Sequence, residues 1–106
     1  MPRTPEQAWA PIAKAQRTNR GVTGGTGFGN NEGLRISGKI FAMLVRGELV
    51  VKLPKDRVDE LVDARVAARF DAGKGRPMKE WASVPPTASR RWQALVEEAR
   101  AFVGSR

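Results

Sequence analysis

Apolar residues recur at helical spacing near both ends of the chain. The stretch Thr4-Pro5-Glu6-Gln7 has the pattern of a helix start with a capping box, and an apolar stripe follows from Trp9. Pro11 lacks a donor and clashes one turn back, so we expect this helix to kink or restart there. Both observations predict an N-terminal helix within residues 1–20. A second stripe, which predicts a C-terminal helix, consists of Trp92, Leu95, Val96, Ala99, Phe102 and Val103.

The middle of the chain alternates apolar and polar positions with a period of two. This pattern predicts three strands, at Leu34–Ile36, Lys39–Val45 and Glu48–Leu53. The pairs Ser37-Gly38 and Arg46-Gly47 between them are typical of two-residue hairpin turns. We therefore expect an antiparallel meander.

After this meander the helical period returns once and is followed by two short strands. A helix is expected after Pro54, with Lys55 and Asp59 paired across one turn. Strands are expected at residues 68–70 and 78–84. The predicted order is α-β-β-β-α-β-β-α, a two-layer α+β sandwich with an antiparallel sheet and helices mainly on one face. At 106 residues the chain fits one domain, spanning residues 1–106.

Six glycines lie between residues 21 and 33. A phosphate-binding glycine loop follows a buried strand and opens a helix. Here the glycines follow a predicted helix and precede a strand, and no G-K-[ST] accompanies them. We interpret residues 21–33 as a connector between the N-terminal helix and the sheet and helices of residues 34–103.

Strand parity predicts that both faces of the sheet are apolar. Through the Arg46-Gly47 turn one face is wholly apolar and suits the helices. The other face is apolar in its middle, and its expected members are Leu34, Ile36, Phe41, Met43 and Trp81. An apolar patch of this kind usually marks contact. Either the glycine segment or the first helix covers it, or it forms a homodimer interface or a ligand groove.

The chain is basic and lacks the residues of most catalytic and metal sites. Nineteen Lys and Arg against eleven Asp and Glu give a net charge of +8, spread over the chain, which attracts nucleic acid. His and Cys are both absent, so disulfides are excluded, a zinc site is not expected and the commonest general base is missing. We therefore expect that the protein is not an enzyme and that it binds neither a metal ion nor a cofactor. The absence of a long apolar run or of an apolar signal core predicts a cytoplasmic chain without a membrane span.

Two sets of charged residues are candidates for contacts. The glycine turn before the last strand, with basic neighbours on the sheet, is either a solvated hairpin tip or a site for an anion or nucleic acid. Its candidate contacts are Lys39, Lys52, Lys74, Arg76 and Lys79. Parity also places Arg35 and Glu80 together on the helix side, where a structural ion pair would satisfy both. Phe41 and Trp81 beside lysines resemble a small stacking platform for single strands.

The runs GTGFG, GKIFAMLVRGELVVKLP and FDAGKGRPMKEWASVP, with the final amphipathic helix, resemble the TfoX/Sxy N-terminal domain and the related YjbR/MmcQ group. The match covers residues 21–103, and its most specific elements are Gly38-Lys39, Gly75-Arg76-Pro77 and Val84-Pro85. The resemblance implies a secretion-chaperone-like or YjbR-like α+β fold and a bacterial regulatory module linked to DNA-uptake competence. The chain departs from the family in GFGN at 27–30, in Arg65 where glycine is frequent, and in lacking a second domain.

These observations together predict a non-catalytic regulatory or binding module. Its expected partner is an unidentified protein or a second copy of the chain, bound through the second sheet face. The alternatives are a nucleic-acid-binding protein that uses the basic surface and, as a third, an enzyme acting on a small or phosphorylated ligand.

Overall fold

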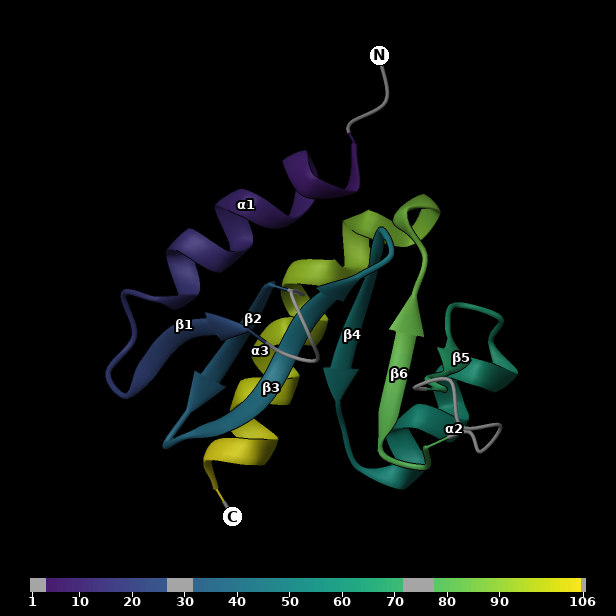
Figure 1. The fold of residues 1–106 in the computed structure, drawn as a ribbon. Helices are drawn as coiled ribbons and strands as arrows, with labels where there is room; N and C mark the ends of the chain where they lie inside the picture. The colour runs from purple at the N-terminus through teal and green to yellow at the C-terminus, as the bar shows by residue number, and fades with distance from the viewer. Residues whose placement is uncertain (1–3, 27–31, 72–77, 106) are drawn as a thin grey trace.

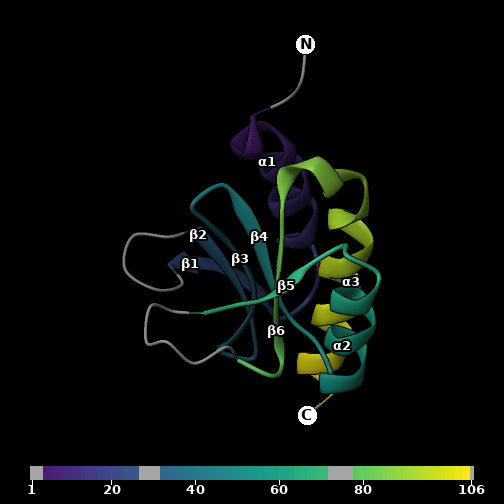
Figure 2. The ribbon, with the colours of Figure 1, turned by 90° about the vertical axis from the view of Figure 1, so that its right-hand side faces the viewer.

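The computed structural model describes residues 4–26, 32–71 and 78–105, which form an α+β fold (Figure 1). Six strands make one antiparallel sheet in the order β1-β2-β3-β4-β6-β5. Figure 2 shows the helices on one side of this sheet. The expected fold class is confirmed. The elements, listed in chain order, are α1 (Pro5–Gln16), β1 (Val22–Thr26), β2 (Glu32–Ile36), β3 (Lys39–Val45), β4 (Glu48–Lys52), α2 (Lys55–Asp63), β5 (Ala68–Arg69), β6 (Trp81–Val84), the 3-10 helix η1 (Pro86–Arg91) and α3 (Trp92–Gly104).

The first helix begins as its sequence predicts. The Thr4 side chain accepts from the Gln7 amide at 3.1 Å, and the Thr4 amide donates to the Gln7 side chain at 3.0 Å. This reciprocal pair satisfies two amides that a helix start leaves open. Pro11 lies inside α1, which runs unbroken from Pro5 to Gln16, so the expected restart does not occur.

The glycine-rich segment contributes a strand, and its interpretation as a connector was wrong. Residues 22–26 form β1, which pairs with β2 from Val22↔Ile36 to Thr26↔Glu32. Glycine is weak evidence for a strand because it has no side chain to pack. β1 adds one strand to the predicted order, and the part of the segment at residues 27–31 lies outside the described residues.

The two predicted tight turns are present. Ser37 and Gly38 have φ of 52° and 80°, and Arg46 and Gly47 have φ of 51° and 79°. Positive φ at both central residues twists a hairpin in the direction that antiparallel strands require. These turns fix the register of β2, β3 and β4.

A β-bulge in β3 breaks the strict alternation of its side chains. Leu34 pairs with Ala42 but Arg35 pairs with Ile40, so Phe41 is an extra residue. Phe41 and Ala42 both join the helix-side core, and Ile40 packs on the opposite face. Leu34 and Ile36 also belong to the helix side, so placing Leu34, Ile36 and Phe41 on the second face was wrong.

The second face of the sheet is apolar, as expected, but it is buried within the single chain. Its cluster is Met43, Val45, Val50, Phe70 and Trp81, with Ile40 and Met78 packed against it. Met43 and Val50 have no exposed surface, and Trp81 is 9% exposed. The first helix does not cover this face, because Trp9 and Ala13 belong to the helix-side core. The expected exposed docking patch is therefore absent from the described surface.

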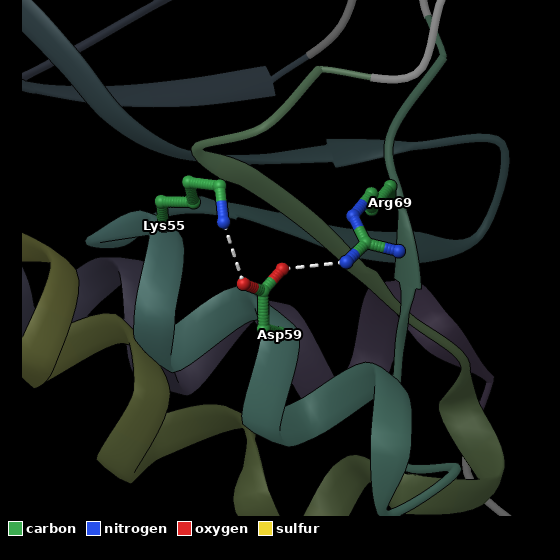
Figure 3. Close-up of polar contacts among 3 residues, drawn as sticks. All are labelled: Lys55, Asp59 and Arg69. Carbon is green, nitrogen blue, oxygen red and sulfur yellow. Dashed lines mark hydrogen bonds and ion pairs between the residues drawn. The ribbon is translucent and has the colours of Figure 1, made fainter.

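Ion pairs attach α2 to its neighbours (Figure 3). Lys55 Nζ lies 2.9 Å from Asp59 Oδ2, which confirms the predicted pair, and Arg69 Nη2 of β5 binds the other oxygen. The hydrogen bonds from Lys55 and then from Arg69 lower the pKa of Asp59 below its ordinary value. On the other side of α2, Arg57 Nε lies 2.9 Å from Glu98 Oε1 of α3.

Candidate functional site: a basic pocket at one end of the sheet

Antiparallel topology brings four segments to the same end of the sheet. β2 and β4 end where β3 and β6 begin, because neighbouring strands run in opposite directions. The sequence places a basic residue at or next to three of these strand ends, namely Arg35, Lys39 and Lys52. The fourth strand, β6, begins with Trp81.

These residues line one pocket of about 470 Å³. Its lining consists of Arg35, Lys39, Ile40, Lys52, Trp81 and Val103. Three cations and no carboxylate are among these lining residues, so the pocket carries a concentrated positive charge. We call it the basic pocket.

The aromatic wall of the basic pocket positions one of the cations. Lys52 and Trp81 are directly opposite each other in the β4–β6 register, and Lys52 Nζ lies 5.6 Å from the Trp81 ring centroid. This is within the range of a cation–π contact. Trp81 is anchored in the second-face core, so the contact holds the ammonium at a fixed place over a buried ring.

Arg35 is oriented by the turn that follows its strand. Its Nη1 donates to the carbonyl oxygen of Gly38 at 3.2 Å. That bond spans the Ser37-Gly38 turn, and Lys39 is the residue that follows the turn. The bond therefore orients the Arg35 guanidinium beside the turn that precedes Lys39. The predicted ion pair between Arg35 and Glu80 stays a prediction.

The sequence-predicted anion contacts are distributed unevenly. Lys39 and Lys52 meet in the basic pocket. Lys79 is exposed and lies just before β6. Lys74 and Arg76 lie outside the described residues, so the predicted anion site at their glycine turn stays a prediction. Arg35, Ile40 and Val103 were not predicted as pocket residues, although the first two lie near strand ends, which is a signal in the sequence.

A stacking platform of Phe41 and Trp81 is not formed. Phe41 lies on the helix side with no exposed surface, and Trp81 exposes 9% of its surface with Lys52 over its ring. Neither of these two rings presents an open face on which a base could stack.

Two other hollows have a different chemical character. A hollow of about 520 Å³ between α1 and η1 has Arg90 as its one charged wall residue, with Ile12, Gln16 and Gln93 among the others. A smaller one contains Arg46 and Arg69 but also Glu48 and Asp71, and Ser83 Oγ donates to Glu48 at 2.5 Å there. The first hollow therefore has a single positive charge, and in the second the two positive charges are balanced by two carboxylates.

Comparisons with protein-family models, with curated proteins and with solved structures gave no match. In residues 4–26, 32–71 and 78–105 there is no helix long and apolar enough to span a membrane, and no cluster of three acidic residues able to hold a metal ion.

Proposed function

We propose that the chain is a non-catalytic regulatory or binding module, of the kind that its resemblance to the TfoX N-terminal domain implies. Its ligand is a phosphate-bearing molecule bound in the basic pocket. The observation that carries the proposal is the convergence of Arg35, Lys39 and Lys52 on one pocket without a lining carboxylate. The proposal places the module in the cytoplasm, where such ligands are abundant.

Phosphate suits this set of side chains. Lysine ammonium groups act as point charges toward phosphate oxygens, and a guanidinium adds directional N–H donors. Arg35, Lys39 and Lys52 line the same pocket, so an anion bound there is attracted by all three. The apolar walls, Ile40, Trp81 and Val103, limit the screening of this attraction by water.

Binding, rather than turnover, follows from the residues that surround the pocket. Lysine and arginine hold an anion but are poor general bases while protonated. The whole chain has no His and no Cys to supply a base or a thiolate. The proposal therefore assigns the pocket a recognition role and no reaction.

Pyrophosphate is a suitable probe because it presents the phosphate chemistry without a base or a sugar. We expect calorimetric titration to show saturable binding, and Lys39→Gln to raise the dissociation constant about tenfold, since one charge-assisted contact is lost. Lys14→Gln is the matched control, because Lys14 is an exposed lysine on α1 outside the pocket. No saturable binding, or equal effects of both substitutions, would overturn the proposal.

A further inference from the structure

Phosphate groups reach proteins either on free metabolites or along a nucleic-acid backbone. We propose that the basic pocket binds the phosphodiester backbone of single-stranded nucleic acid, independently of base sequence. This inference rests on the proposed function and names the class of ligand.

Basic residues continue beyond the pocket, because Lys79 lies exposed in the turn before β6. Lys39, Lys52 and Lys79 belong to β3, β4 and the turn before β6, which are adjacent in the sheet. The Leu53 amide donates to the Glu80 carbonyl at 2.9 Å, which keeps the residue after Lys52 beside the residue after Lys79. Basic residues on three adjacent segments of the sheet suit a polymer of phosphates, whereas a small metabolite needs only the pocket.

The shape and charge of the molecule favour a single strand over a duplex. Proteins that read duplex DNA insert a basic helix or ribbon into the major groove. The solvent side of α2 carries Asp56, Glu60 and Asp63 against one exposed lysine, Lys55, and that of α3 carries Glu97. The exposed charges of α1 are one acidic and one basic residue, Glu6 and Lys14, so none of the three is a basic helix. Arg35, Lys39 and Lys52 line a recess instead, which a flexible strand can enter by bending its backbone.

Recognition through the backbone follows from the burial of Trp81, the aromatic residue among those that line the basic pocket. Trp81 is largely buried beneath Lys52, so it does not stack a base. Contacts to phosphates set affinity and position but do not read sequence. A strand without bases is therefore expected to bind as well as one with them.

The test compares four ligands on the full chain by fluorescence anisotropy and calorimetry. They are an oligothymidylate about 15 nucleotides long, an abasic strand of equal length, a duplex of equal length and pyrophosphate, the strand length being near the upper site size of small single-strand binders. We expect the two single strands to bind within about twofold of each other, and the duplex several-fold more weakly. With about three phosphate contacts, affinity should fall about 20-fold between about 50 and about 200 mM salt.

The Lys39→Gln and Lys79→Gln variants locate the strand. Each should reduce that salt-dependent loss from about 20-fold to about 7-fold, while Lys14→Gln leaves it unchanged. Far-UV circular dichroism of each variant checks that it is folded. Substitution of an exposed lysine leaves the core intact, so the comparison holds.

Each remaining outcome has a defined meaning. Pyrophosphate binding without strand binding overturns this inference but keeps the proposed function, and absence of all binding overturns both. A duplex that binds as tightly as the strand rejects the preference for a single strand. Oligothymidylate that binds much more tightly than the abasic strand rejects recognition through the backbone.

Discussion

Lys52 Nζ lies 5.6 Å from the centroid of the Trp81 ring, across the register of β4 and β6. The two residues join the interior of the second sheet face to the basic pocket at its end. Trp81 supplies a ring anchored in the core, and Lys52 supplies a charge at the pocket. The pair therefore connects the packed second face to the proposed binding site.

Replacing Lys52 by methionine keeps most of the side-chain volume and removes the charge. We expect the free energy of unfolding to fall by about 0.5–1 kcal/mol, because the cation–π contact with Trp81 is lost. Urea denaturation measures this change, with Lys14→Met as the control. A Lys52→Met variant as stable as the wild type would show that the contact contributes nothing to the fold.

A charge at Phe41 should unfold the chain. Phe41 is fully buried among the helix-side residues, so Phe41→Asp loses its packing and buries a carboxylate, at a cost of about 4 kcal/mol or more. That is a large part of the total stability of a domain of this size. Circular dichroism and sedimentation measure the outcome. A folded Phe41→Asp monomer would contradict the placement of Phe41 in the core.

The fold class followed from the sequence because its strongest signals are local. Capping at Thr4, the glycine turns and the helical stripe of α3 each involve neighbouring residues. The sequence did not predict which side chains of β3 lie on which face of the sheet. The bulge at Phe41 depends on pairing with β2, and no glycine or proline marks it in the sequence. One extra residue moved three expected face residues to the other side.

The candidate site was predictable only in part, because it depends on topology. Lys39 and Lys52 were named from charge alone, but their convergence requires the antiparallel order of β3, β4 and β6. Arg35 was assigned to the helix side by a parity that the bulge invalidates. If the strand order had been known, the strand ends that meet at one end of the sheet would have placed all three cations together.

Arg65 is a position where glycine should stabilise the protein. Its φ is 60°, and the Val66 amide donates to the Leu61 carbonyl at 3.0 Å, which is the bond pattern of a Schellman helix end. A side chain in this left-handed conformation costs about 1 kcal/mol, so Arg65→Gly should raise the free energy of unfolding by about that amount. Ala64→Gly is the control, because Ala64 has helical φ and ψ. Equal effects of the two substitutions in thermal and urea denaturation would contradict this account.

The Asp59 ion pairs predict a loss of stability in acid. Hydrogen bonds from Lys55 and Arg69 lower the pKa of Asp59 in the folded state. The contribution of Asp59 to the stability of the fold is therefore fully present above its pKa in the unfolded chain, and it is lost as pH falls through its pKa in the folded state. Stability of the wild type should therefore decline below about pH 4 more steeply than that of Asp59→Asn. Urea midpoints measured from neutral to acid pH test this. Parallel curves for the two proteins would mean that Asp59 is not responsible.

The hydrogen bond between Lys55 and Asp59 also predicts a loss of stability at high pH. The hydrogen bond to Asp59 raises the pKa of Lys55 in the folded state. The contribution of Lys55 to stability is therefore fully present below its pKa in the unfolded chain, and it is lost as pH rises through its pKa in the folded state. Lys55→Gln should flatten the decline of stability in alkali, and Lys14→Gln should not. Identical alkaline curves for both variants would contradict the assignment.

Amide and indole nuclear magnetic resonance during a pyrophosphate titration tests the central claim most directly. Trp9 and Trp92 are buried in the helix-side core, whereas Trp81 lines the basic pocket, so the three indole signals report on different places. We predict that the Trp81 indole and the amides of Arg35, Lys39 and Lys52 shift together and saturate, while the indole signals of Trp9 and Trp92, which share the helix-side core, stay in place. Shifts confined to the hollow between α1 and η1, or no saturable shifts at all, would contradict the assignment of the basic pocket as the binding site.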